Sequence, residues 1–568
     1  MPILPSSPNA PETGAPANGT SENDRSASSN ASVSLPAKQG TVVLEKDVPI
    51  SQSLIWQRQR DSYVQRGLKS WTEDMVPQFI TNNSFIAEIY ARIVFGFVCD
   101  WLNLSQTDSE PPVPENPLRI LELGAGPGKF SFLFLRQLET LLHSRNIPLG
   151  VVRYCMTDCS ESLVHAWPLN KALSEFFEQG VLQCEVLDAG AEINSRFLRS
   201  DTSDSAADTR GPLVVIANYV FDSLPHDAFV IESGRVFELL QTTTARHQIG
   251  SNTAPTALSS LQFSYNKVQT TSDRYDDPAW NNILDSYRRR LPGATVLFPS
   301  QTLKTLDAIA EFTDGAMLVL AADKGYVHED SLLISPAAPT YEFHTANCFS
   351  QLVNFDAIAK YFESRGGEGF LPEKRSSNLH LCAFLSHQPG AQFNSTRDAI
   401  QQAHSSPGPD DLFALLAWLN PQMDEMSVPQ ILALLKLSRW DPTTFLRLFP
   451  VLARQIRNVT IERGDLLEAI LRICANHFPI TPTDNVLSFQ CGVILLELRF
   501  FQEASSMLKH SQATLGRSAA ASYNLGLCAQ GLSRPDEALA LMIEACDLDP
   551  SFEPACLMRR KLEQHSAK

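Results

Sequence analysis

The sequence has little positive charge and no long apolar run. Its 568 residues contain 46 Lys and Arg against 63 Asp and Glu, which gives a formal net charge of −17. Nucleic acids bind proteins through concentrated Lys and Arg, so we expect neither a nucleic-acid partner nor a membrane-surface partner. A membrane-spanning helix needs about 20 apolar residues, and the densest apolar runs, FSFLFL and AMLVLAA, are much shorter.

Closely spaced cysteine pairs are also missing. The chain contains 11 Cys but no CxxC pair, so we expect neither a metal site nor a disulfide framework. The first residues lack a basic segment followed by an apolar one, as a signal peptide would have. These absences predict a cytoplasmic protein with reduced thiols.

A chain of 568 residues exceeds what one hydrophobic core can serve, so several domains are expected. Residues 1–42 are rich in Ser, Asn, Pro and Ala and predict a disordered tail. Residues 43–110 predict a helical segment that belongs to the following domain, because apolar residues recur there at helical spacing. Residues 111–390 predict an α/β domain, and residues 391–568 predict an all-helical domain.

Apolar runs typical of buried strands alternate with helical patterns in the α/β domain. The runs are LRILELG, VVRYCMTD, VLQCEVLDA, PLVVIANYVF, GAMLVLAAD and LHLCAFL. Continuous apolar strands separated by helices predict a doubly wound, Rossmann-like and mostly parallel sheet with both faces covered. Residues 232–300 interrupt this pattern and predict a β-rich insertion followed by a helix.

The last part of the chain repeats itself at a regular spacing. Gly492 aligns with Gly526, and Ala504 aligns with Ala538 at the same separation. The pattern resembles two tetratricopeptide repeats (TPR), at residues 485–518 and 519–552. Helical repeats of this kind present a concave surface to proteins or peptides, so the resemblance implies a protein or peptide partner. An ordinary helical bundle remains the alternative.

The stretch ILELGAGPGKF joins the first apolar strand to a helix. It is not a phosphate-binding P-loop, because Gly128 and Lys129 are not followed by Ser or Thr. A dinucleotide site would need a third glycine where Lys129 stands. Gly124, Gly126 and Gly128 instead follow Glu122 in the pattern ExGxGxG. Glycines let a ligand approach the backbone, whereas the carboxylate would repel a pyrophosphate and attract a cation.

This pattern resembles motif I of the class I methyltransferases, which implies a Rossmann-like fold and S-adenosyl-L-methionine (SAM) as cofactor. Ligands of such folds lie across the carboxyl ends of the strands, where Asp158, Asp188 and Asn218 end the next three strands. Asp158 can accept bonds from the ribose hydroxyls and Asp188 from the adenine amino group, and Asn218 would lie near the methionine moiety. Together with Glu122 and the three glycines they form the predicted cofactor site.

Three further segments resemble the MidA-like methyltransferases, a family that includes a mitochondrial complex I assembly factor. They are VPQFITNNSFIAEIYARIVFGFVCDWL, IANYVFDSLPHDAFVI and VNFDAIAKYFESRG. The second matches the family pattern at Asn218, Asp222, Leu224 and Pro225, but Tyr219 stands where the family has Glu. The arginine side chain that the best-known family member methylates therefore does not carry over to this chain as a substrate, and Tyr219 is kept as a candidate substrate-binding residue.

Candidate catalytic residues lie just beyond the fourth strand. Asp222 and His226 are positioned for a base that removes a proton from the methyl acceptor. Thr81 and Asn82, in a polar loop before the second helical pattern, are candidates for closing over the substrate. The alternatives are a turn cap for Asp222, a surface histidine for His226 and a helix cap for the polar loop.

These observations predict a SAM-dependent methyltransferase that acts on a protein or peptide side chain and is recruited by its TPR-like domain. Two alternatives stay open. The first is a SAM-binding assembly factor or adaptor that has lost catalysis, because Tyr219 replaces an acid. The second is a small-molecule methyltransferase in which residues 232–300 form a lid. A nucleotide-dependent oxidoreductase is disfavoured by Lys129.

Overall fold

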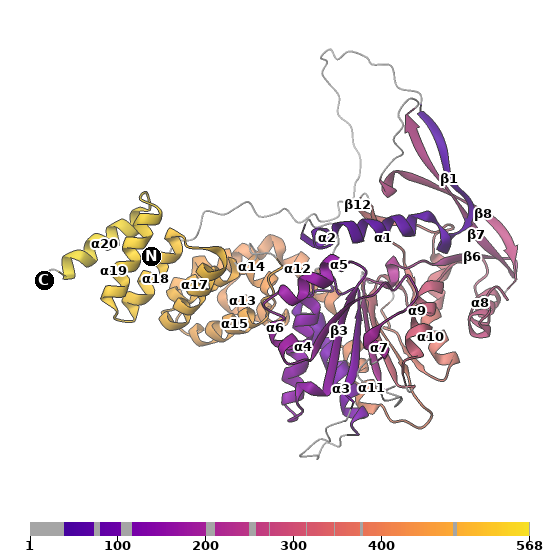
Figure 1. Cartoon of the computed structure of the whole chain (residues 1–568), viewed down its shortest axis with the longest axis horizontal. Coiled ribbons are helices and arrows are strands. Elements are labelled where there is room, and N and C mark those ends of the chain that lie inside the picture. The colour runs from indigo at the N-terminus through magenta and orange to yellow at the C-terminus, as the bar shows by residue number, and fades with distance from the viewer. Residues whose placement is uncertain are drawn as a thin grey trace, which may run out of the picture.

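The computed structural model describes residues 39–72, 80–103, 116–199, 211–248, 257–271, 273–313, 315–345, 347–374, 379–480 and 486–566. In these ranges an α/β unit and an array of helices lie end to end (Figure 1). Of the tail expected at residues 1–42, residues 1–38 lie outside the described part of the chain. From there strand β1 (Gln39–Pro49) begins, so the last part of the expected tail belongs to a strand.

The α/β unit is built on a seven-stranded sheet in the order β15-β16-β10-β5-β2-β3-β4. In chain order the strands are β2 (Leu118–Leu123), β3 (Val152–Asp158), β4 (Leu182–Val186), β5 (Leu213–Asn218), β10 (Met317–Asp323), β15 (Glu368–Phe370) and β16 (His380–Ser386). The five strands from β10 to β4 are parallel, and β16 is antiparallel to both of its neighbours. The predicted mostly parallel sheet is therefore present. Only the short β15 was missed.

The direction of strand succession reverses between β2 and β5. From β2 the chain adds β3 and then β4 on one side, and it then crosses over to add β5 and β10 on the other. Leu123 of β2 pairs with Ala217 of β5, so these strands end at the same edge. Such a reversal opens a crevice at the carboxyl ends of the strands, where ligands of open α/β sheets bind.

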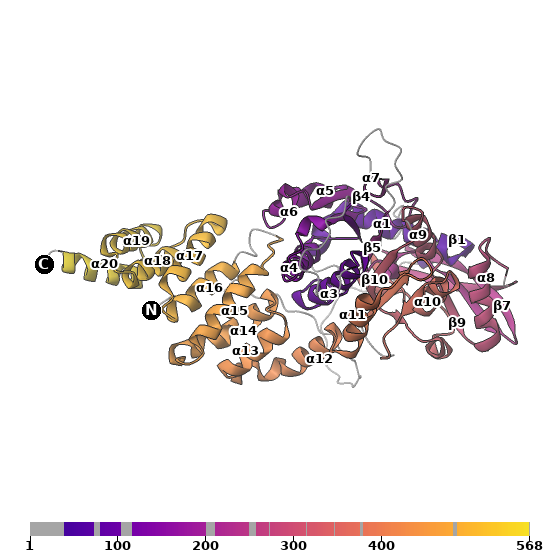
Figure 2. The same cartoon turned by 90° about the horizontal axis from the view of Figure 1, so that it is seen from below.

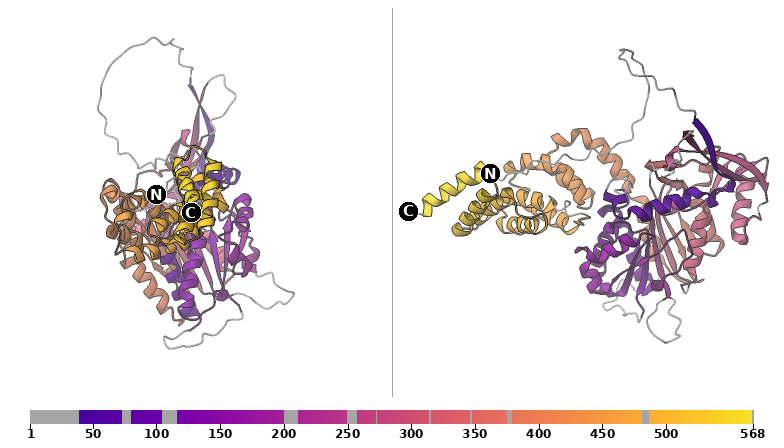
Figure 3. Two further views of the ribbon diagram at one scale, coloured as in Figure 1. Left: turned by 90° about the vertical axis from the view of Figure 1, so that its left-hand side faces the viewer. Right: turned by 45° about the horizontal axis from the view of Figure 1, so that its top comes forward.

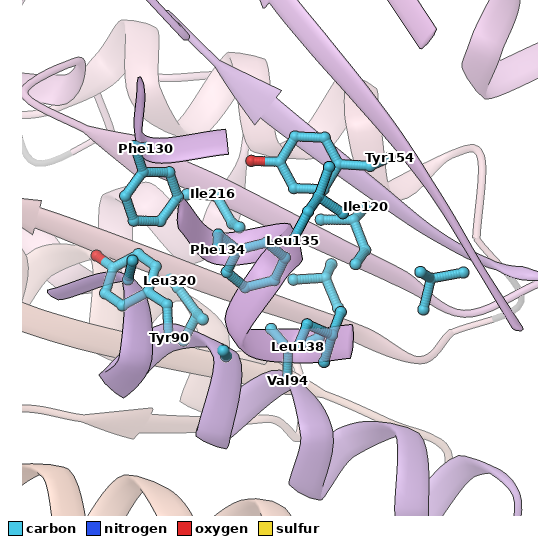
Figure 4. Close-up of a cluster of buried hydrophobic side chains, with 14 of the residues drawn as sticks. Tyr90, Val94, Ile120, Phe130, Phe134, Leu135, Leu138, Tyr154, Ile216 and Leu320 are labelled. Carbon is cyan, nitrogen blue, oxygen red and sulfur yellow. The ribbon is translucent and has the colours of Figure 1, made fainter. Parts of the chain in front are cut away.

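Helices and a second sheet cover the two faces of the central sheet, and each face carries its own apolar core. On one face lie α3 (Ser84–Trp101) and α4 (Lys129–His143). Figure 4 shows Tyr90 of α3 beside Phe130 of α4, and their ring centroids are 5.4 Å apart. The other face is covered by α8 (Pro278–Arg290), α9 (Ser300–Ala310) and α10 (Phe355–Ser364).

The second sheet is antiparallel and contains the predicted insertion. Its strands are β1, β6 (Asp227–Glu232), β7 (Arg235–Gln248), β8 (Leu261–Thr270) and β9 (Thr295–Phe298). The insertion is β-rich and leads into α8, as expected. However, β1 comes from a remote, earlier part of the chain and pairs with β7, with Val42 opposite Ala245. The expectation of helix at residues 43–49 was therefore wrong, because the strand forms through a partner that is distant in sequence.

Helix α1 (Leu54–Arg66) follows β1 through a 3-10 turn, and α2 (Lys69–Thr72) follows α1. Helix α1 crosses the carboxyl edge of the central sheet (Figures 1 and 3). Its start is tied to β1, because the carboxylate of Glu45 accepts hydrogen bonds from the Leu54 amide at 2.8 Å and from the Ser53 hydroxyl. The N-terminal strand thus fixes the helix that covers this edge.

From residue 391 onward the described chain is helical, as predicted. Its α-helices are α11 (Asn394–Ser405), α12 (Pro409–Leu419), α13 (Val428–Leu437), α14 (Pro442–Gln455), α15 (Arg463–Ala475), α16 (Val486–Glu497), α17 (Phe501–Leu515), α18 (Ala519–Gly531), α19 (Pro535–Leu548) and α20 (Glu553–Ser566). They form a row that extends away from the sheet (Figure 2). The first, α11, is joined to α3, since Asp100 accepts the Thr396 amide at 2.7 Å.

The repeat spacing of the sequence reappears in the packing of two helix pairs. A Cβ added to Gly492 of α16 would lie 2.7 Å from Leu508 of α17, and one added to Gly526 of α18 would lie 2.6 Å from Met542 of α19. Leu508 and Met542 are separated along the chain by the same interval as the two glycines. Both glycines therefore permit the same close approach of one helix to the next.

Among the helices that the structure describes, none is both long enough and apolar enough to cross a membrane. The cytoplasmic location stays a prediction.

Candidate functional site

A cavity of about 390 Å³ lies at the carboxyl edge of the sheet, beside the reversal between β2 and β5. Residues that end or follow β2, β3, β4 and β5 form its walls, and α1 supplies the remaining side. Seven residues singled out from the sequence line it: Gly124, Asp158, Asp188, Asn218, Tyr219, Leu224 and Pro225. The structure thus brings all three predicted strand-end residues, Asp158, Asp188 and Asn218, to one hollow.

The three glycines of the turn all have left-handed backbone, with φ of 64°, 55° and 87° for Gly124, Gly126 and Gly128. Only Gly124 is among the residues that line the cavity. A Cβ on Gly126 would lie 2.7 Å from Trp71, and one on Gly128 would lie 2.7 Å from Met156. These two glycines therefore make room for side chains of the protein, and their predicted contact with the cofactor stays a prediction.

Glu122 lies beneath the glycine turn and is not among the lining residues. Its carboxylate accepts hydrogen bonds from the Tyr154 hydroxyl at 2.8 Å and from the Ser131 hydroxyl. Burial raises the pKa of Glu122 to about 7. The expectation that this carboxylate faces a cationic ligand is corrected, because its partners hold it in the support of the turn.

Asp158 joins the glycine turn to the cavity. One carboxylate oxygen accepts the Gly126 amide at 3.2 Å, the other accepts the Ser160 amide at 3.0 Å, and burial raises the pKa of Asp158. Each carboxylate oxygen can accept more than one hydrogen bond. Asp158 therefore keeps acceptor capacity for the hydroxyl groups of a ligand, at the place where the sequence analysis expects ribose.

Asp188 lines the cavity and pairs with Arg60 of α1. Its other oxygen accepts the Gly190 amide at 2.8 Å. The sequence analysis did not identify Arg60. Nothing in the local sequence distinguishes it from the other arginines of α1, because its importance depends on where the helix crosses the sheet.

Asn218 at the end of β5 has one satisfied and one unsatisfied polar atom. Its Oδ1 accepts the Tyr90 hydroxyl at 2.7 Å, whereas its buried Nδ2 has no hydrogen-bond partner among the described residues. A buried donor without a partner costs roughly 1 to 3 kcal/mol. The atom is therefore suited to donate to an oxygen of a bound ligand.

Tyr219, the next residue, has a left-handed backbone with φ of 52°. Its amide is held by the Ala322 carbonyl at 3.0 Å. A non-glycine residue in this conformation is strained by about 1 to 3 kcal/mol, and such strain is concentrated at functional sites. The half-buried Tyr219 thereby becomes part of the cavity wall, where the sequence analysis expects substrate contact.

Asp222 is buried and lies outside the cavity lining, next to Asp323 at the end of β10. The Asp222 amide donates to Asp323 Oδ2 at 3.2 Å, and the Ser223 hydroxyl donates to Asp222 Oδ1 at 3.0 Å. Burial raises the pKa of Asp222 to about 6, and burial and the neighbouring Asp222 charge raise that of Asp323 well above its usual range. Asp222 thus belongs to a buried pair of carboxyl groups and does not face the cavity, contrary to the expectation of a base that contacts the substrate.

His226 is fully buried and also lies outside the cavity lining. Its ring packs edge-on against Trp56, with centroids 6.2 Å apart. Burial lowers the pKa of His226 to about 4, so the ring is neutral at pH 7. The residue is therefore neither the surface histidine of the alternative interpretation nor a group in contact with the cavity.

Thr81 and Asn82 lie before α3 and do not line the cavity. The following residue, Asn83, caps α3 by accepting the amides of Phe85 and Ile86 at 2.9 and 3.1 Å. The amide of Ser84, the first residue of α3, donates to Asp441 of the helical region at 3.4 Å. This loop therefore lies where the α/β unit meets the helical region, and the cap interpretation holds for Asn83.

The polar groups that line this cavity suit a nucleoside without phosphate groups. Carboxylate acceptors stand at the ends of β3 and β4, an unsatisfied amide donor stands at the end of β5, and the lining cation Arg60 is already paired. Residues 98–354 match a protein family described as "Putative S-adenosyl-L-methionine-dependent methyltransferase". This region is a SAM-dependent methyltransferase domain. The match includes the glycine turn and the strand ends, and it leaves the helical region outside.

Solved structures that match the chain have low sequence identity to it. An uncharacterized protein from Burkholderia thailandensis is 13% identical, with 60% of this chain and 87% of that chain covered and a TM-score of 0.36. Another protein from that organism, bound to S-adenosyl-homocysteine, is 12% identical, with 61% and 97% covered and a TM-score of 0.34. MamA from Desulfovibrio magneticus is 19% identical, with 28% and 86% covered and a TM-score of 0.22. No curated protein matches the chain.

Proposed function

We propose that the chain transfers a methyl group from SAM to a protein or peptide side chain, and that its helical region recruits the partner. The supporting observation is the direct attachment of the helices to the cofactor-binding unit. Phe478, between α15 and α16, packs against Phe132 of α4 with ring centroids 5.4 Å apart. Nearby, the Asn170 side chain donates to the Pro479 carbonyl at 3.1 Å. A partner held by the helices would therefore lie close to the glycine turn.

The TPR-like interpretation of the helical region belongs to this proposal. It is supported by the repeated approach of Leu508 to Gly492 and of Met542 to Gly526, which recurs at one constant spacing along the chain. Arrays of such helix pairs bind extended peptides on their concave face. The helical region would thus select the substrate while the methyltransferase domain supplies the chemistry.

The residues of the cavity would bind and orient, because the methyl group of SAM is already activated for transfer to a nucleophile. Asp158 and Asp188 would accept hydrogen bonds from the nucleoside, and Asn218 Nδ2 would donate one to the amino-acid portion. Helix α1 closes one side of the cavity and would exclude water. Such alignment in a dry site is the main contribution that a protein makes to this kind of displacement.

We also propose a relationship to the MidA-like methyltransferases. Asn218, Leu224 and Pro225 of the matching pattern line the cavity, and Asp222 of the same pattern forms the buried pair with Asp323. Tyr219 occupies the wall where the family pattern has Glu. The substrate of the family is therefore not transferred to this chain.

A second candidate function is a SAM-binding assembly factor or adaptor without catalysis. One observation favours it: neither Asp222 nor His226, the expected proton acceptors, lines the cavity. The small-molecule alternative relied on residues 232–300 as a lid. The described residues of that range contribute nothing to the cavity lining, which α1 completes instead, so no observation favours this alternative.

Radiolabelled methyl transfer tests the proposal. Full-length protein, labelled SAM and a lysate of cells that lack the protein should give a labelled polypeptide. Asp158→Ala should abolish the label, and Lys304→Ala on the exposed side of α9 should leave it unchanged. Calorimetry with S-adenosyl-homocysteine accompanies the assay. Binding of this ligand without any labelled polypeptide would favour the adaptor, and no heat at all would contradict cofactor binding by this chain.

A further inference from the structure

A second and larger cavity, of about 870 Å³, lies between the α/β unit and the helical region. Helix α4, helix α5 (Glu161–Ala166) and the residues after α5 form one wall. Helices α15, α16 and α17 and residues 477–480 form the other. The cavity therefore exists only because the two parts of the chain are packed together.

The charge of this cavity differs from that of the whole chain. None of the 23 described residues that line it is Asp or Glu, whereas acidic residues make up 63 of the 568 residues of the chain. The wall carries Arg136 of α4 and Lys171, and two histidines, His477 and His510. Neither Arg136 nor Lys171 forms an ion pair within the described part of the chain. The described wall of the cavity thus carries positive charge in a protein of net charge −17.

Apolar side chains make up much of the same wall. Phe132, Trp167 and Met507 line the cavity, together with Leu169, whose side chain is 83% exposed. Leu169 is exposed and Met507 is half-buried, whereas Phe132 and Trp167 are buried, so the apolar part of the wall is only partly open to solvent. An occupant that suits this wall therefore carries both acidic and apolar groups.

The second cavity reaches the cofactor-binding turn. Leu163 of α5 lines both cavities, and Pro127 of the glycine turn lines the second. The Trp167 indole, which lines the second cavity, donates to the Gly126 carbonyl at 2.9 Å. An occupant of the second cavity would therefore contact the supports of the first.

We propose that this cavity binds a peptide segment of the partner protein in which acidic residues alternate with apolar ones. The inference rests on the proposed function and names the chemistry of the segment that the helices recruit. Arg and Lys form charge-assisted hydrogen bonds with carboxylates. The volume of this cavity is near the upper end of the roughly 300 to 1,000 Å³ typical of small-molecule pockets. About half of its wall comes from the helical region, and helical arrays of this kind hold peptides.

Binding of two peptide pools to the full-length protein tests the charge preference. In the acidic pool, short fluorescent peptides alternate Glu or Asp with Leu, Ile, Phe or Met, and in the matched pool Lys or Arg replaces each acid. Fluorescence anisotropy should show binding of the acidic pool alone, weakening as salt is added. Equal binding of the two pools, or no binding of the acidic pool, would overturn the proposal.

A pair of double variants with the same change in charge tests the location. Arg136→Glu with Lys171→Glu should weaken binding of the acidic pool at least tenfold. Lys304→Glu with Lys436→Glu, on exposed faces of α9 and α13, should change it less than twofold. Acidic peptides that carry photo-leucine should crosslink to residues 163–172, 474–480 and 486–514. Equal effects of the two double variants, or crosslinks confined to other residues, would overturn the proposal.

Two further measurements separate the remaining outcomes. If the acidic pool binds only after residues 1–38 are deleted, the chain's own N-terminus is the occupant and the proposal fails. S-adenosyl-homocysteine is titrated into the same protein samples. If it binds and the acidic pool does not, the inference fails while the proposed function stands. Peptide binding without heat from S-adenosyl-homocysteine would instead contradict the proposed function.

Discussion

Arg60 of α1 forms an ion pair with Asp188, the second residue after β4, in the wall of the cofactor cavity. The Arg60 side chain is 44% exposed and that of Asp188 is 19% exposed. Ion pairs with this much solvent access contribute only about 0 to 1 kcal/mol. The contact therefore holds α1 over the cavity weakly enough to be exchanged for a contact between Asp188 and a ligand.

Arg60→Ala should accelerate both binding and release of S-adenosyl-homocysteine, because α1 loses one of its contacts with the opposite wall. The dissociation constant should change by no more than about fivefold, which corresponds to about 1 kcal/mol. Stopped-flow tryptophan fluorescence can follow the reaction, since Trp56 lines the cavity. Arg58→Ala on the same helix, outside the lining, is the matched control. Unchanged rates in Arg60→Ala would show that the ion pair does not restrain α1.

Gly126→Ala should weaken binding of S-adenosyl-homocysteine at least tenfold. The new Cβ would lie 2.7 Å from Trp71 on a backbone with φ of 55°, so the turn or the tryptophan must move. Gly180→Ala is a control outside the cavity lining, because Gly180 also has left-handed backbone, with φ of 67°, but open space around it. Calorimetry on the two variants makes the comparison. Equal affinity of Gly126→Ala and wild type would mean that the contact between turn and Trp71 is dispensable.

Asp323→Asn should stabilise the protein more at pH 8 than at pH 5. Burial and Asp222 raise the pKa of Asp323, so its stabilising contribution is complete below the unfolded-state pKa of about 3.9 and is lost as pH rises through the folded-state value. The Asn amide can donate to the Asp222 carboxylate without titrating. Melting temperatures of variant and wild type at the two pH values measure the effect. The exposed Asp536→Asn serves as control, and a difference that is independent of pH would argue against the buried pair.

Gly526→Ala should destabilise the helical region by about 1 to 3 kcal/mol, because an added Cβ would lie 2.6 Å from Met542. Gly464→Ala in α15 meets no atom within 4 Å, and it should be neutral or slightly stabilising because Ala favours a helix. Urea denaturation monitored by circular dichroism compares the variants. Similar midpoints for the two would indicate that α18 and α19 do not need this close approach.

Much of the central sheet could be predicted because strands covered on both faces consist of continuous apolar runs. The same property located the strand ends, and Asp158, Asp188 and Asn218 were found there. Strand β1 could not be recognised in the same way, since its partner β7 lies in a distant part of the sequence. The ion pair of Arg60 with Asp188 could not be predicted for a related reason, because it depends on the path of α1 across the sheet.

Residue type alone also could not show which acids face the cavity. Glu122 has the position expected for a ligand contact, but Tyr154 and Ser131 hold it beneath the turn. Asp222 has the position expected for a base, but Asp323 approaches it from another strand. In each case the deciding neighbours belong to other elements of the fold, and their approach follows from the assembled sheet.

Strand β1 has a consequence for any shortened gene product. A protein that starts after residue 49 would lack one outer strand of the second sheet, and the long β7 beside it would be left open to pair with other molecules. The same deletion would remove Glu45, which holds the first turn of α1. Insolubility and poor cofactor retention would then appear together, because the same short segment both pairs with β7 and holds the start of α1.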